Sequence, residues 1–208
     1  MSDRYSAVTD EYRQLAPNYD ERWARYVRDS QAHTLKTIGT FNSGSALDVA
    51  CGTGTMLQSL HQRYPEATLS GCDISPEMLE IADTKLGSAA SLINSPAEKL
   101  PYPDNSFELI TCNSALHYFP DAESAVREMW RVLLPGGQLV ITDWCNDFIT
   151  VRFLNRIQQW RDPAHIRTFG SRQLQTLISS AGMNIEHCET YKLDWFWGLA
   201  TVSASKPV

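Results

Sequence analysis

The stretch ALDVACGTG, residues 46–54, decides the fold of this chain. An apolar run that carries one acidic residue, Asp48, passes directly into small residues and two glycines, Gly52 and Gly54. This pattern predicts a buried strand that turns sharply into a helix. Because the glycines keep side chains out of the turn, a ligand can lie against the backbone there.

Short β-compatible runs alternate with helical patterns along the rest of the chain. The first five runs span residues 46–50, 68–73, 91–94, 107–112 and 138–143. This alternation predicts an α/β fold in which helices cover both faces of a parallel sheet. Two longer runs after residue 183, joined by a short turn near Asp194, predict an antiparallel pair that closes one sheet edge.

Two of the helical patterns have recognisable ends. Ser75 is expected to cap a helix that has Pro76 at its first position and Gly87 just past its end. A second helix is expected to begin at Asp121 and to stop at Pro135, where two glycines follow. Both helices follow predicted strands, as an α/β alternation requires.

Composition limits the classes of function. The 208 residues, 43% of them hydrophobic, suit one domain over 1–208, and the net charge of −6 disfavours nucleic acid as a partner. Five cysteines without CxxC spacing predict reduced thiols and a cytoplasmic protein, and no apolar stretch predicts a membrane span. The five histidines lack metal-ligand spacing, so no metal is expected.

An acidic residue at the end of the second predicted strand is the second indication of a ligand site. Asp73 follows Gly52 by 21 residues, a spacing that suits an acceptor for both hydroxyls of a ribose. The alternative is that the glycines only make a tight turn and Asp73 only caps a helix. Leu57 stands where a dinucleotide-binding fold needs its third glycine, so NAD is disfavoured as the ligand. The negative charge of Asp48 would repel a pyrophosphate but attract a sulfonium or an ammonium.

Four motifs in order resemble the class I S-adenosylmethionine-dependent methyltransferases. They are LDVACGTG, GCDISPEML, SPAEKLPYPDNSFELITC and RVLLPGGQLVIT, and the chain is similar to the small ubiquinone and menaquinone biosynthesis enzymes of this class. The resemblance implies a Rossmann-like, doubly wound sheet of seven mostly parallel strands in the order 3-2-1-4-5-7-6, with the last strand antiparallel. It also implies helical lid segments and S-adenosylmethionine as cofactor, with S-adenosylhomocysteine as product.

The resemblance also assigns the residues that hold the cofactor. Those expected around its methionine, ribose and adenine parts are Asp48, Ala50, Gly52, Gly54, Asp73, Ile74, Met78, Ala97, Glu98, Asn113 and Tyr19. The third motif departs from the family pattern, because Pro96 stands where an aspartate often accepts from the adenine amine. We expect Glu98, a backbone carbonyl or water to accept the hydrogen bond from the adenine amine instead.

The acceptor side carries fewer signals. His117 follows the fourth strand, where this fold presents side chains to the acceptor, and it is a candidate general base or a packing residue. Tyr118 is expected to form pocket wall or core. Tyr19, Trp23 and Tyr26 share one helical face within an N-terminal cap, residues 1–40, which packs on the sheet or closes over the cofactor.

An inserted segment, residues 149–172, is a second candidate lid. Its arginines, Arg152 and Arg156 among them, give it a local excess of positive charge, which predicts an anionic acceptor or only a solvated face. Phe153, Ile157 and Trp160 are expected to form its buried stripe. Core packing is also expected for Trp195 and Trp197 in the sequence DWFWG.

These observations favour a methyltransferase that acts on a small molecule by in-line displacement, with positioning and desolvation supplying much of the rate. The compact chain shows no large substrate domain. Two alternatives stay open. One is a protein methyltransferase, and the other is an S-adenosylmethionine-binding regulatory or partner protein without transferase activity.

Overall fold

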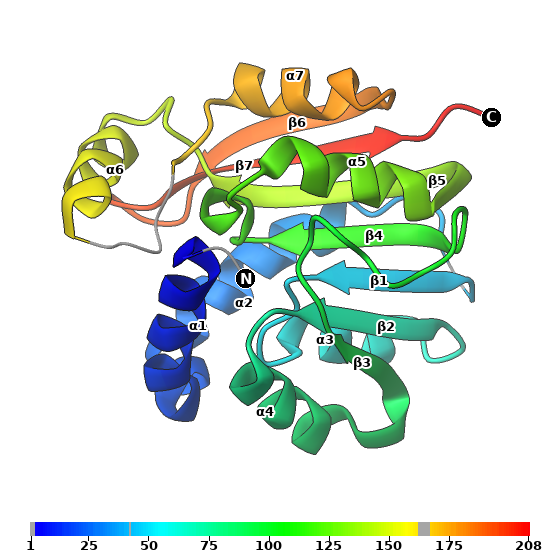
Figure 1. The fold of residues 1–208 in the computed structure, drawn as a ribbon. Coiled ribbons are helices and arrows are strands. Elements are labelled where there is room, and N and C mark those ends of the chain that lie inside the picture. Colours follow the sequence, from blue (N-terminus) through cyan, green and yellow to red (C-terminus); the bar gives the residue numbers. More distant parts are fainter. Residues whose placement is uncertain (1–2, 42, 162–166) are drawn as a thin grey trace.

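A computed structural model describes residues 3–41, 43–161 and 167–208. Its seven strands form one sheet in the order β3-β2-β1-β4-β5-β7-β6 (Figure 1). Their bounds are β1 Ser45–Val49, β2 Thr68–Asp73, β3 Ala90–Asn94, β4 Phe107–Asn113, β5 Leu133–Trp144, β6 Asn184–Lys192 and β7 Gly198–Ser205. Strands β1 to β5 pair in parallel, whereas β7 is antiparallel to both β5 and β6. The predicted strand order and the antiparallel last strand are confirmed.

Helices cover both faces of the sheet. They are α1 Asp3–Leu15, α2 Tyr19–Thr37, α3 Thr55–Arg63, α4 Pro76–Leu86, α5 Ala122–Val132, α6 Ile149–Arg161 and α7 Ser171–Ser180, with short 3-10 helices η1 Ala16–Asn18, η2 Gly87–Ala89 and η3 Leu116–Tyr118. Helices α5 and α7 lie on one face, and α2 and α3 lie on the other (Figure 1). Helix α1 lies beyond the carboxyl ends of β1 and β4.

The predicted helix ends are confirmed at three of four positions. Ser75 accepts a hydrogen bond from the Met78 N–H at 3.3 Å, and Gly87 follows the last residue of α4. Asp121 caps α5 by accepting from the Ser124 N–H at 2.9 Å. Helix α5 ends at Val132, however, because Leu133 already pairs with Phe107 as the first residue of β5.

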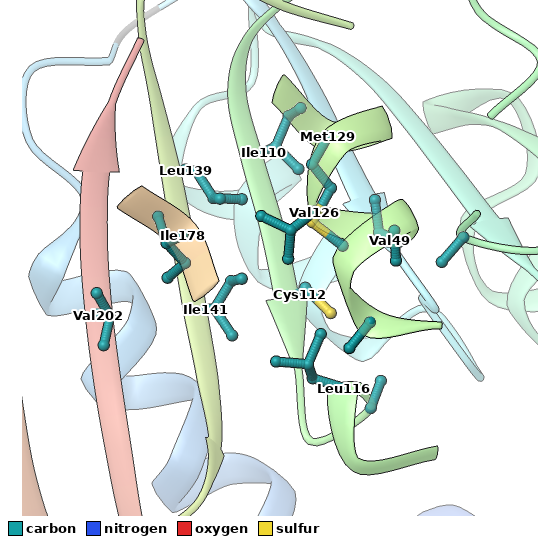
Figure 2. Close-up of a cluster of buried hydrophobic side chains, with 14 of the residues drawn as sticks. Val49, Ile110, Cys112, Leu116, Val126, Met129, Leu139, Ile141, Ile178 and Val202 are labelled. Atoms are coloured by element: carbon teal, nitrogen blue, oxygen red, sulfur yellow. The ribbon is translucent and has the colours of Figure 1, made fainter. Parts of the chain in front are cut away.

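The larger core lies between the sheet and helices α5 and α7. Figure 2 shows Val126 and Met129 of α5 against Ile110 of β4, and Ile178 of α7 beside Ile141 of β5. All five side chains are fully buried. Val49 of β1, the strand before the glycine turn, belongs to the same core, so close packing fixes β1, β4 and β5 relative to one another. Among the described residues, no helix is long and apolar enough to cross a membrane.

Candidate functional site

The turn after β1 is held open by its backbone conformation. Ala50, Gly52 and Gly54 all have positive φ, at 57°, 53° and 78°. A Cβ on Gly52 would meet nothing within 4 Å, whereas one on Gly54 would lie 2.8 Å from Leu86 of α4. Gly52 therefore borders open space, and Gly54 lets α3 approach α4 closely.

Asp73 ties this turn to the start of α4. Its Oδ2 accepts from the Gly52 N–H and its Oδ1 from the Ser75 N–H, both at 2.8 Å. The side chain is only 9% exposed, and burial raises the pKa of its carboxyl, although these two hydrogen bonds act in the opposite direction. Each oxygen keeps a second lone pair, so the carboxylate can still accept from ligand hydroxyls.

A main pocket of about 690 Å³, its open mouth included, lies beside Asp73. Its lining contains eight of the expected cofactor residues, namely Tyr19, Ala50, Gly52, Asp73, Ile74, Met78, Ala97 and Asn113. Glu98 does not line it, and its carboxylate instead contacts the Tyr5 hydroxyl and the Asp121 N–H. The lining also includes Pro96, the residue that departs from the family pattern.

A second hollow, the acidic recess, adjoins the main pocket and is lined by Asp48. The Asp48 carboxyl is 2% exposed and accepts from the Thr111 hydroxyl at 2.6 Å. Burial raises its pKa to about 7, and the charge of Asp73 acts in the same direction. None of the residues that line this recess in the described parts of the chain is basic, so a cation from a ligand would stabilise the ionised carboxyl.

Asn113 offers a further polar group to the same space. Its Oδ1 accepts from the Thr34 hydroxyl at 2.5 Å. Its Nδ2 is buried and has no hydrogen-bond partner among the described residues. A buried donor without a partner is costly, so this atom is suited to receive a ligand oxygen.

A third hollow, the aromatic chamber, has about 540 Å³ of space. Seven aromatic side chains line it together with Glu11, Leu15, Ser114 and His117, and these seven are Tyr12, Tyr19, Trp23, Tyr26, Tyr118, Trp144 and Trp197. Tyr19 and Ser114 line all three hollows, so the hollows meet there. Trp197 is half-buried, in partial agreement with the core packing expected for it.

His117 forms a buried pair with Asp143 at the edge of the chamber. Its Nδ1 lies 2.5 Å from Asp143 Oδ1, and its backbone N–H donates to Oδ2 at 3.1 Å. Both residues are 1% exposed, and the imidazole stacks on Trp144 with a centroid distance of 4.2 Å. An Nδ1–H that donates to a carboxylate leaves the tautomer whose Nε2 can accept a proton.

Helix α1 covers the main pocket with residues that the sequence patterns did not single out. Tyr5, Val8 and Tyr12 line it, and α1 itself lies beyond the strand ends (Figure 1). An ion pair between Arg13 and Glu77, at 2.6 Å, joins α1 to α4. The spacing of Val8 and Tyr12 by four residues was the available signal, because it places both on one helix face.

For residues 149–172 the expectations are an anionic-acceptor site or only a solvated face for the arginines, and a buried stripe for three apolar side chains. Arg152 and Arg156 are exposed on α6 and line none of the three hollows. Phe153 is 68% exposed, so the prediction that it belongs to a buried stripe is wrong, and Trp195 at 79% is likewise not core. The side chain of Trp160 and residues 162–166 lie outside the described part of the chain.

Comparison with known proteins defines the class of this domain. Residues 47–141 match the family model described as a methyltransferase domain. The match covers just under half of the chain, and the Rossmann-like strand order and the turn after β1 agree with it. Within that class, the curated relatives resembling it include quinone-biosynthesis methyltransferases.

Two such relatives give the extent of the likeness. A demethylmenaquinone methyltransferase of Deinococcus radiodurans is 34% identical over 157 residues, which cover 68% of this chain and 62% of that protein. The ubiquinone/menaquinone biosynthesis C-methyltransferase UbiE of Desulfotalea psychrophila is 38% identical over 125 residues, 60% of this chain and 48% of that protein. The chain therefore matches less than two thirds of the length of these relatives.

A solved structure shares the fold over nearly the whole chain. It is the putative methyltransferase in a complex with the Haloferax volcanii Trm112 methyltransferase activator, with a TM-score of 0.86 and 18% identity. The superposition covers 97% of this chain and 98% of that one. At this identity the likeness shows the fold alone.

Proposed function

We propose that this protein is an S-adenosylmethionine-dependent methyltransferase that acts on a small molecule held in the aromatic chamber. The observation that carries the proposal is that three hollows meet at Tyr19 and Ser114. A cofactor that fills the main pocket and the acidic recess would face an acceptor in the chamber at that junction. Such proximity converts methyl transfer into an effectively unimolecular step.

The residues present fit this cofactor. The carboxylates of Asp73 and Asp48 would accept from ribose hydroxyls and from the ammonium, respectively, and Asn113 Nδ2 would donate to the carboxylate. Ile74 and Met78 give the main pocket an apolar wall for a purine ring. When bound, S-adenosylmethionine supplies a methyl group that its sulfonium makes electrophilic.

The chamber favours a planar, largely apolar acceptor. Aromatic side chains surround most of it, and offset or edge-to-face ring contacts suit a flat aromatic molecule. The names of the relatives suggest a hydroxylated naphthalene of the demethylmenaquinone type. The anionic acceptor expected from Arg152 and Arg156 stays a prediction, because the described lining of the chamber contains Glu11 but neither arginine nor lysine.

His117 is proposed as the general base for such an acceptor, with Tyr118 as part of the wall that orients it. A ring hydroxyl must lose its proton for the ring to become a strong nucleophile, and His117 Nε2 would take that proton. Asp143 would hold the ring in place and stabilise the imidazolium that forms.

Helices α1 and α2 are proposed to act as the cap that excludes water during transfer. Tyr12 and Tyr19 come from these helices and line both the main pocket and the chamber. Exclusion of water prevents loss of the activated nucleophile to solvent. All five cysteines are free thiols, which supports the proposal that the protein works in the cytoplasm.

The test is a transfer assay with radiolabelled S-adenosylmethionine and a chemically reduced, short-chain demethylmenaquinone. We expect label in the organic phase with the wild type and a loss of about a hundredfold or more in kcat with His117→Gln. The exposed His61 on α3 provides the control, because His61→Gln should leave the rate unchanged.

Two results would contradict the proposal. Cofactor binding without transfer to this quinol or to a panel of phenols and amines would favour the regulatory alternative. Transfer to protein substrates only would favour a protein methyltransferase, in which case the chamber would serve a side chain and not a free small molecule.

A further inference from the structure

Three large apolar side chains are exposed near one end of the molecule. Ile149 is 80% exposed, Phe153 68% and Trp195 79%. Among the described residues only Trp130, at 36%, and the terminal Val208 join them as exposed large hydrophobics. Singly exposed apolar residues are common on proteins, but a group of them indicates an interaction surface.

The three side chains belong to two segments that contact each other. Ile149 and Phe153 are four residues apart on α6 and so share one helix face. The Thr150 hydroxyl, one residue after Ile149, donates to the Phe196 carbonyl at 2.8 Å. Helix α6 accordingly lies beside the turn between β6 and β7 that carries Trp195 (Figure 1).

Basic side chains flank these apolar residues. Arg152, Arg156 and Lys192 are all exposed, and we call these three together with Ile149, Phe153 and Trp195 the α6 patch. Two acidic side chains lie close to these residues in the sequence. Asp147 accepts from the Ser171 hydroxyl at 2.5 Å, and Asp194 accepts from two backbone N–H groups of the turn, so both are bound by neutral donors and keep their negative charge. The three basic residues of the α6 patch still outnumber these two acids, which leaves a local charge of +1 (three minus two) on a chain whose net charge is −6.

We propose that the α6 patch docks on the surface of an anionic lipid bilayer. Tryptophan and phenylalanine side chains insert at the boundary between headgroups and acyl chains, and arginine and lysine bind anionic headgroups. A surface that carries both kinds of side chain can bind the headgroups and the acyl-chain boundary of an anionic bilayer at the same time. A second copy of the chain fits less well, because a twofold contact would bring Arg152 and Arg156 against the same charges of the other copy.

The α6 patch is continuous with the aromatic chamber. The Trp195 ring lies 5.4 Å from Phe196, and Phe196 lies 4.9 Å from Trp197, which lines the chamber. If the proposed function holds, an apolar acceptor dissolved in the bilayer would reach the chamber along these rings. The lipid contact itself does not depend on that function.

Vesicle sedimentation tests the proposal. The full chain is spun with vesicles of phosphatidylcholine alone and with vesicles that also contain phosphatidylglycerol. We expect preferential binding to the anionic vesicles and a loss of about tenfold in the partition coefficient for Phe153→Ser and for Trp195→Ser. Arg152→Gln combined with Arg156→Gln should cost about fivefold per charge on anionic vesicles only.

The matched control removes two arginines from another surface. Arg127→Gln combined with Arg172→Gln, on α5 and α7, changes net charge equally and should leave vesicle binding nearly unchanged. Equal losses in the patch and control variants, or no binding to anionic vesicles, would overturn the proposal. So would a dimer in light scattering that Phe153→Ser dissociates while vesicles bind nothing.

Binding of S-adenosylhomocysteine to the same variants separates this proposal from the proposed function. Phe153→Ser and Trp195→Ser should keep cofactor affinity and the rate on a water-soluble phenol, while losing vesicle binding. If the enzyme assays fail but the wild type still binds anionic vesicles through the patch, only the proposed function is wrong. If the assays succeed and vesicles bind nothing, only the lipid contact is wrong.

Discussion

Replacement of Asp48 by asparagine should stabilise the ligand-free protein at alkaline pH. Burial raises the pKa of this carboxyl from 3.8 to about 7. Because a tenfold change in a proton-binding constant is worth about 1.4 kcal/mol, ionising Asp48 in the folded state costs about 4 kcal/mol relative to the unfolded chain. Asparagine keeps the shape and can still accept from the Thr111 hydroxyl, but it does not ionise.

The sign of the pH dependence follows from the raised pKa. Below pH 3.8 the Asp48 carboxyl is protonated in both states and no penalty arises. As pH rises, the unfolded chain ionises first, so the wild type loses stability until the folded carboxyl has ionised near pH 7. The asparagine variant escapes this loss, and its advantage in free energy of unfolding should approach about 4 kcal/mol at pH 8 and be small at pH 4.

Urea unfolding of ligand-free protein at several pH values measures this difference. An exposed carboxylate on α4 serves as control, since Asp83→Asn should change the stability little at either pH. The same Asp48→Asn variant should bind S-adenosylmethionine more weakly, because the recess loses its negative charge. A stability difference that does not grow with pH, or a variant less stable than wild type at pH 8, would show that burial does not raise the pKa of Asp48.

Three further changes have expected outcomes. Gly54→Ala combines a φ of 78° with a 2.8 Å approach to Leu86 and should cost about 2 to 3 kcal/mol in urea unfolding, and an unchanged stability would contradict this close approach. Lys206 is 7% exposed and donates to three oxygens at 2.8 to 2.9 Å, so Lys206→Met should cost about 2 kcal/mol; a thermal melt unchanged from wild type would contradict this role. Tyr12→Ala removes a ring shared by the main pocket and the chamber, so stopped-flow release of S-adenosylhomocysteine should become faster, and a slower release would contradict the assignment of α1 as a cover.

The parts of the fold set by local chemistry could be predicted from the sequence. Strand β2 has the predicted bounds, and the caps at Ser75 and Asp121 follow from side-chain hydrogen bonds within three residues. The end of α5 was predicted too late, because pairing of Leu133 with β4 is a tertiary contact that the sequence pattern does not contain.

Most of the residues expected around the cofactor do line the main pocket, because many of them belong to two strand ends that carry recognisable motifs. Their contact with the cofactor itself stays a prediction. The aromatic chamber could not be predicted from the sequence. Tyr26, Trp144 and Trp197 come from α2, β5 and the turn before β7, and they meet only in the folded chain. The pairing of Asp143 with His117 could not be predicted for the same reason, because the two residues are 26 positions apart in the sequence. The position of Asp143 at the carboxyl end of a strand was the one available signal.

The most direct test of the central claim is calorimetric titration of the purified protein with S-adenosylmethionine, S-adenosylhomocysteine and, as a control, NADH. We expect that the first two bind, that NADH does not, and that Asp73→Asn weakens the binding of both by about tenfold or more. Failure of both to bind, or tighter binding of NADH, would show that the pocket beside Asp73 serves another ligand.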